Sequence, residues 1–269
     1  MALFRHPMKS FILLILMVFL SNTAYAQTRS VFLEDLTWTE VRDAVATGTV
    51  TAIIYAGSTE QNGPHMALGK HNFIARYVAQ RIASNLGNAL VYPVLPFAPT
   101  GDAVAKTDHM RFPGSVSVSE STFAAVAREF AQSAAAAGFR NIALIGDHGG
   151  GQEALARVAS DLTTQWRAQG IRVLYVPDAY VKSFELVTEF LARQNLSPGQ
   201  HAGLSDTSEL MAIDTDGRWI RQDKISANTP ANGVDGDPRR ASVEFGQQFL
   251  RFKVDSAVAQ IRNLIAQPH

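Results

Sequence analysis

Five histidines lie away from both ends of the chain, and their types and spacing favour metal chemistry. Each lies in a segment with glycine, proline or an acid nearby, and together they are His65, His71, His109, His148 and His201. Imidazole and carboxylate are ligands that suit Zn, Mn or Fe, and glycines let the backbone approach a small site closely. One histidine alone is more often an ordinary core or surface residue, but the joint pattern favours a metal site.

Other catalytic chemistries fit the sequence less well. There is no Gly-x-Ser-x-Gly motif, and the absence of cysteine excludes thiol catalysis, thiolate metal sites and disulfides. Gly146 to Gly151 follows an apolar run and precedes a helical pattern, as a phosphate-binding loop would. It contains no lysine, however, and Asp147 would repel an anion, so phosphate binding is a weaker alternative.

The elements that must position these histidines read as alternating strands and helices. Short apolar runs predict buried strands at 51–56, 89–97, 141–146 and 171–176. Helical patterns cover 72–86, 119–137, 152–169 and 239–267, the last as one helix or two. We therefore expect an α/β fold with a mainly parallel sheet covered on both sides. Three of the four predicted strands are followed by histidines, so these should meet beyond the carboxyl ends of the strands, where ligands bind in such sheets.

The bulk composition is that of a globular protein with a sizeable core. The chain has 269 residues, of which 46% are hydrophobic and 18% charged, and its formal net charge is zero. No block of lysine and arginine is present to neutralise phosphates, which argues against a nucleic-acid partner.

The N-terminus has the pattern of a secretory signal peptide. Arg5 and Lys9 precede an apolar run from Phe11 to Leu20, and Ala24 and Ala26 make a small-x-small cleavage site. A membrane anchor is the alternative, but a spanning helix needs about 20 apolar residues, twice this run. We expect residues 1–26 to be removed after Ala26, and 27–269 to form a single domain in the periplasm or outside the cell, not attached to a membrane.

Five segments, taken in order, resemble motifs of the creatininase family of metal-dependent amidohydrolases. Gly57 to His65 (GSTEQNGPH) is similar to a motif ending EQHGPH, and Asp108 to Ser115 (DHMRFPGS) to EHxxFPGT. Gly146 to Gly151 (GDHGGG) resembles NGHGGN, His201 to Ser208 (HAGLSDTS) resembles HAGxxETS, and Gly233 to Ser242 (GVDGDPRRAS) resembles GVxGDPxxAS. The resemblance implies a three-layer α/β/α sandwich, a two-metal centre that activates water to open an amide, and a homo-oligomer, often a hexamer.

The resemblance also implies which residues bind the metal. The first glutamate of the family falls on Glu60, the histidine of NGHGG on His148, and the acid of the ETS motif on Asp206. Two positions differ. The family histidine two residues after the glutamate is Asn62 here, and the family aspartate that bridges the two metals is His71.

These two departures change the expected metal centre. A bridging carboxylate offers one oxygen to each metal, whereas a neutral imidazole offers one lone pair and serves one metal. We therefore expect one divalent metal (Zn, Mn or Fe) per chain, bound by Glu60, His71, His148 and Asp206. Asn62 would contact the substrate or support a ligand.

The remaining polar residues of the motifs have two interpretations each. His201 is a candidate for proton transfer, since the family keeps a histidine there, or it orders its loop. Asp108 and His109 orient a ligand or close the site, or they anchor the loop before Phe112. His65 lies behind the ligands or contacts the substrate. Lys70 contacts an anionic substrate or is an ordinary solvated lysine.

The resulting prediction is a hydrolase of a small amide, cyclic or linear, in which metal-activated water attacks a carbonyl. Hydrolysis of a lactone or of a ring C–C bond is an alternative on the same site. A non-catalytic protein that binds a small molecule on the same scaffold is another, because the bridging aspartate is lost.

Overall fold

The computed structural model describes residues 30–226, 229 and 231–268, so the predicted signal peptide lies outside the described residues. Its sheet has four parallel strands in the order β2-β1-β3-β4. The strands are β1 (Thr51–Ala56), β2 (Ala89–Val91), β3 (Asn141–Gly146) and β4 (Arg172–Tyr175).

β1 and β3 match the predicted ranges, β4 is one residue shorter at each end, and β2 is much shorter than predicted. It ends at Val91, before Pro93 and Pro96, which have no N–H to donate to a ladder. Beyond it, only an isolated bridge joins Leu95 to Ala56. The prolines thus convert the second half of the predicted strand into a loop.

The helices include all four predicted segments and three that the sequence patterns did not indicate. The α-helices are α1 (Trp38–Ala46), α2 (Lys70–Leu86), α3 (Glu120–Ala136), α4 (Gln152–Trp166), α5 (Val181–Ala192), α6 (Leu204–Ile213) and α7 (Val243–Ala266). Short 3-10 helices cover Leu33–Asp35, Asp108–Arg111, Arg167–Gln169, Pro177–Ala179, Gln222–Lys224 and Pro238–Arg240. The C-terminal stretch is one helix.

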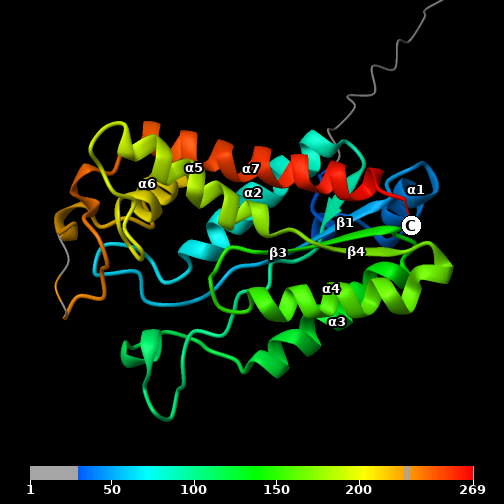
Figure 1. Cartoon of the computed structure of the whole chain (residues 1–269), viewed down its shortest axis with the longest axis horizontal. Helices are drawn as coiled ribbons and strands as arrows, with labels where there is room; N and C mark the ends of the chain where they lie inside the picture. Colours follow the sequence, from blue (N-terminus) through cyan, green and yellow to red (C-terminus); the bar gives the residue numbers. More distant parts are fainter. Residues whose placement is uncertain (1–29, 227–228, 230, 269) are drawn as a thin grey trace, which may run out of the picture.

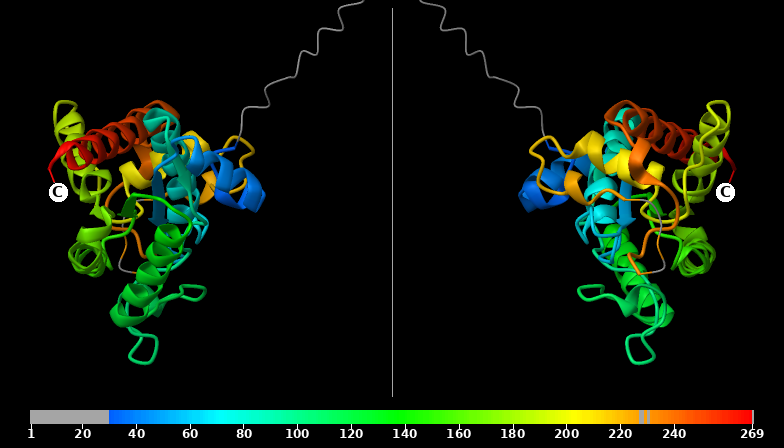
Figure 2. Two further views of the ribbon diagram at one scale, coloured as in Figure 1. Left: turned by 90° about the vertical axis from the view of Figure 1, so that its right-hand side faces the viewer. Right: turned by 90° about the vertical axis from the view of Figure 1, so that its left-hand side faces the viewer.

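The sheet separates two layers of helices, as Figures 1 and 2 show. Ile53 and Tyr55 of β1 face α2 and α7, whereas Ala52 and Ile54 face α3 and α4. Because both faces are covered, all six residues of β1 and of β3 are buried. This three-layer α/β/α arrangement confirms the predicted fold. Among the described residues, no helix is both long enough and apolar enough to cross a membrane.

The carboxyl ends of β1 and β3 bring distant segments together. Residues 57–69 follow β1 and lead into α2, while Asp147 and His148 directly follow β3. The backbone N–H of Asp147 donates to the carbonyl of Ala56 over 2.9 Å, which joins the two strand ends. The segment that carries His109 loops out beyond the same end of the sheet (Figure 1).

Candidate metal centre

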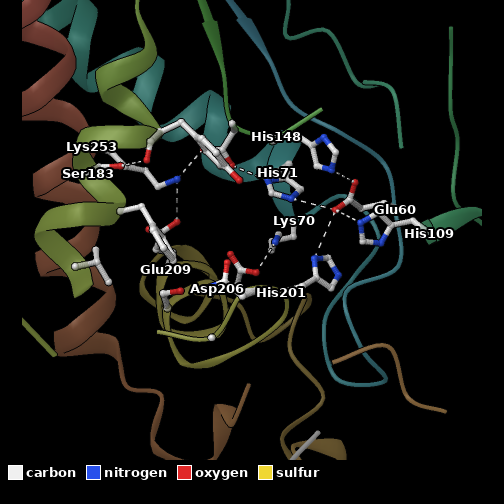
Figure 3. A pocket seen from close by; sticks show the side chains of 18 residues that line it. Glu60, Lys70, His71, His109, His148, Ser183, His201, Asp206, Glu209 and Lys253 are labelled. Carbon is white, nitrogen blue, oxygen red and sulfur yellow. Dashed lines mark hydrogen bonds and ion pairs between the residues drawn. The ribbon is translucent and has the colours of Figure 1, made fainter. Parts of the chain in front are cut away.

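Four imidazoles converge on one buried carboxylate, that of Glu60 (Figure 3). Nε2 of His148 lies 2.9 Å from Glu60 Oε2, and Nε2 of His71 lies 3.3 Å from Oε1. Nε2 of His109 and Nδ1 of His201 lie 3.7 and 3.9 Å from Oε1. These five side chains line a cavity of about 220 Å³. The structure therefore assembles four of the five predicted histidines at one place.

The loop after β1 holds Glu60 rigidly. Ser58 Oγ donates to Glu60 Oε2 over 2.7 Å, and the side-chain amide of Asn62 donates to the Glu60 carbonyl over 2.8 Å. Burial raises the pKa of the Glu60 carboxyl, but the charge of His71 and the hydrogen bond from His148 outweigh it and hold the pKa well below its usual range. Glu60 is therefore ionised at neutral pH.

A carboxylate behind His71 orients this imidazole toward Glu60. Nδ1 of His71 donates to Asp147 Oδ2 over 2.8 Å, so the lone pair of Nε2 faces Glu60 Oε1 when the ring is neutral. Burial and the charge of Lys70 lower the pKa of His71. Glu60 and Asp147 raise it by more than this, so the pKa lies above its usual value. Two acceptors 3.3 Å apart need a cation or a proton between them.

Asp147 is itself part of a buried chain of charges. Its Oδ1 lies 2.9 Å from Nζ of Lys253, which lies 3.3 Å from Oε2 of Glu209. Burial raises the pKa of Asp147, but Lys253 and His71 together lower it below its usual range. Burial raises the pKa of Glu209 to about 7, although Lys253 acts in the opposite direction. Both carboxyls line the cavity, and Figure 3 shows that of Glu209.

His148 is held from behind by the backbone. The N–H of Gly150 donates to Nδ1 over 2.9 Å, which leaves the ring proton on Nε2, where it points to Glu60. A metal bound at Nε2 requires this proton on Nδ1, so metal binding costs the protein one backbone hydrogen bond.

The donor set fits a divalent metal. The described residues contain two groups of ligand atoms close enough for one ion, Glu60 with His71 and His148, and Glu60 with His109 and His201. Oε1 of Glu60 is buried and has no hydrogen-bond partner in the described protein, although a buried acceptor normally has one. A cation beside Oε1 would satisfy both this oxygen and the lone pair of His71.

The structure places the other predicted residues around the site in different ways. Asp206 pairs with Lys70 over 2.9 Å and accepts the N–H of Ala202. It lies outside both groups of ligand atoms, and its predicted role as a metal ligand stays a prediction. Lys70 is fully buried, so its interpretation as a solvated lysine is wrong: the pairing with Asp206 offsets its desolvation.

Asn62 and His65 are buried and do not line the cavity. Asn62 holds the backbone of the Glu60 loop, and Nε2 of His65 hydrogen-bonds Thr207 Oγ1 at 2.9 Å. Both side chains hold neighbouring segments and are fully buried, so neither offers a surface for the substrate contact predicted for them. Asp108 is exposed and lies beside His109 on the rim of a neighbouring hollow.

Sequence reasoning missed Lys253 and Glu209 as site residues and gave Asp147 no partner. Lys253 lies among Leu250, Val254 and other buried residues of α7. A charged residue within an apolar helical stripe was the sequence signal that could have identified it as buried and paired. Its partners could not be found that way, because Asp147 and Glu209 lie on other elements.

Comparisons with known proteins agree with the fold and the motifs. The creatininase family model, described as creatinine amidohydrolase, matches residues 34–261. The creatinine amidohydrolase of Pseudomonas putida is 24% identical over 259 residues, which cover 87% of this chain and 97% of that protein. The mycofactocin precursor peptide peptidase of Mycobacterium ulcerans is 28% identical over 219 residues, covering 78% and 83%.

Solved structures of creatininases have the same fold. A crystal structure of creatinine amidohydrolase superposes with a TM-score of 0.75 at 23% identity, covering 90% of this chain and 100% of the other. A manganese form of creatininase superposes with a TM-score of 0.74 at 23% identity, covering 89% and 100%. One of the similar creatininase structures is described as the Zn-Zn type.

Proposed function

Since the chain belongs to the creatininase family, whose members are metal-dependent amidohydrolases, we propose that it hydrolyses the C–N bond of a small amide, cyclic or linear. The observation that carries this proposal is the convergence of four imidazoles on the buried carboxylate of Glu60, with Oε1 left without a partner. The cavity of about 220 Å³ suits a small substrate or the end of a peptide. Some relatives are named as peptidases, so the linear amides that we propose as substrates include peptide bonds.

The proposed ligands of one divalent metal per chain, zinc in the first instance, are Glu60, His71 and His148. Asp147 supports this set because it orients His71 from behind. When bound, the metal would lower the pKa of water to about 7 and polarise the carbonyl.

The protein's own residues supply the remaining steps. Water gives up a proton as its oxygen adds to the carbonyl carbon, and the leaving nitrogen takes up a proton as the C–N bond breaks. His201 and His109 are placed to move these protons, because their inner nitrogens lie 3.9 and 3.7 Å from Glu60 at the cavity wall. Lys70 and Asp206 lie farther along the same wall, where they would contact polar groups of the substrate.

Metal content and turnover measured together test the proposal. Purified protein should contain one metal per chain and should hydrolyse at least one member of a panel of cyclic amides, lactones and short peptides. His148→Ala should lose both metal and turnover. Turnover of lactones alone would favour the alternative ester chemistry. Metal without turnover on any member would favour a binding protein.

The cellular setting is also proposed. The secretory pattern of residues 1–26 supports export to the periplasm or the medium, and the family supports a homo-oligomer. Fractionation of expressing cells and light scattering of the purified protein test these two points.

A further inference from the structure

The second group of ligand atoms, Glu60 with His109 and His201, differs from the first in how its imidazoles are held from behind. Both are held by one residue, Gln61, which directly follows Glu60. Gln61 is buried, and its amide has a hydrogen bond at each end. The inner nitrogens of the two rings face the cavity (Figure 3).

The orientation of the Gln61 amide follows from its two backbone partners, one of which can only donate a hydrogen bond and the other only accept one. Its Oε1 accepts the backbone N–H of Gly63 over 3.0 Å, and its Nε2 donates to the carbonyl of Gly233 over 3.1 Å. The opposite orientation would place two donors together at Gly63 and two acceptors together at Gly233. A side chain at Gly233 would collide with this amide, so a glycine lets the two segments approach.

This orientation decides where the proton of His109 lies. The second hydrogen of Gln61 Nε2 points to Nδ1 of His109, 3.1 Å away, so Nδ1 must accept. The ring proton is then on Nε2, the nitrogen that faces Glu60 and the cavity. His109 therefore presents an N–H to the cavity.

The backbone of Gln61 has the opposite effect on His201. Its carbonyl lies 2.9 Å from Nε2 of His201 and can only accept, so Nε2 carries the proton. Nδ1, the nitrogen that faces Glu60, is left with its lone pair. Both rings carry the proton on Nε2, but they present opposite ends to the cavity.

We infer that Gln61 is a positioning residue that makes His109 a proton donor and His201 a proton acceptor toward the substrate, and that it disfavours the binding of a second metal at these histidines. The inference rests on the proposed function and adds to it which histidine donates a proton and which accepts one. For Nε2 of His109 to bind a metal, its proton must move to Nδ1, which costs the hydrogen bond from Gln61 Nε2. If the amide turned over to accept that proton, its bonds to Gly63 and Gly233 would be lost as well.

Gln61→Glu tests the inference, because its carboxylate accepts a hydrogen bond where the amide donates one. The proton of His109 should move to Nδ1, while His201 keeps its proton on Nε2, since its partner is a backbone carbonyl. The measurement is ¹⁵N NMR of the ring nitrogens in metal-free, histidine-labelled protein, with His109 identified from a His109→Phe sample. Gln222→Glu adds the same charge at an exposed site and serves as the control.

Zinc titration supplies a second, independent readout. Wild type should bind one zinc ion per chain, whereas Gln61→Glu should bind two, because Nε2 of His109 becomes a ligand beside Glu60 and His201. If Gln61→Glu fails to fold, Gln61→Met should give a mixture of His109 tautomers without changing His201.

Two results would overturn the inference. One is a His109 proton on Nδ1 in the wild type, and the other is a His109 tautomer that stays unchanged when Gln61 is replaced. Absence of turnover in the wild type, without either result, would count against the proposed function instead, since the NMR measurement needs neither metal nor substrate.

Discussion

Replacing Asp147 by asparagine should weaken metal binding, although Asp147 is not itself a proposed ligand. Its Oδ2 accepts from His71 Nδ1 over 2.8 Å and so keeps the lone pair of Nε2 directed to the metal position. Asparagine keeps an acceptor but loses the charge that makes the imidazole a stronger ligand. Loss of such a carboxylate partner typically lowers metal affinity about 10–100-fold, which corresponds to about 1.4–2.7 kcal/mol.

The same substitution should also lower the stability of the metal-free protein. Asp147 Oδ1 lies 2.9 Å from Nζ of Lys253, and this lysine is only 7% exposed. Breaking a buried ion pair costs about 3–5 kcal/mol because a charge is left without its partner. Glu209 remains 3.3 Å from the same nitrogen, so we expect a loss near the lower limit, about 3 kcal/mol.

The assays are a zinc titration in competition with a chelator and denaturant unfolding of the metal-free protein. Asp161→Asn, which breaks an exposed pair with Arg128, is the control and should change neither quantity measurably. A folded Asp147→Asn protein whose zinc affinity stays within about twofold of wild type would refute the role assigned to this carboxylate.

Three further predictions concern Glu209, His148 and the packing of α7 against α6. The folded pKa of Glu209, about 7, lies above its unfolded value of about 4.3, so the folded state binds the extra proton, and stability relative to Glu209→Gln should fall as the pH rises from about 4 to 7. Zinc binding should shift the Gly150 amide resonance, because the hydrogen bond to His148 Nδ1 is lost. Gly246→Ala should destabilise the protein by about 1–3 kcal/mol, since the new Cβ would collide with the Ser208 carbonyl.

A specific result would contradict each of these predictions. Unfolding curves of wild type and Glu209→Gln that change equally with pH would contradict the first. A Gly150 resonance that stays in place at saturating zinc would contradict the second. For the third, Gln247→Ala on the exposed side of the same helix is the control, and an equal effect of both substitutions would exclude a packing cause.

Local signals in the sequence determined the scaffold and the place of the site. Continuous apolar runs such as Thr51–Ala56 are buried on both faces only in a covered parallel sheet, and such a sheet gathers the ends of its strands. His71, His148 and Glu60 therefore could be assigned to one site before any coordinates were known. Helices α1, α5 and α6 were missed. They have only 9, 12 and 10 residues, so an apolar pattern of helical period has little length over which to show.

The tertiary structure alone decided what each polar residue does. The sequence around Lys70 does not determine whether its side chain is solvated or buried. Only the packing of α2 against α6 places it against Asp206. Asp147 and Lys253 are 106 residues apart, and Gln61 and Gly233 are 172 apart. A local pattern reports which face of its own element a residue occupies, whereas a hydrogen-bond partner on another element is set by how the elements pack. The proton positions of His109 and His201 depend entirely on such partners.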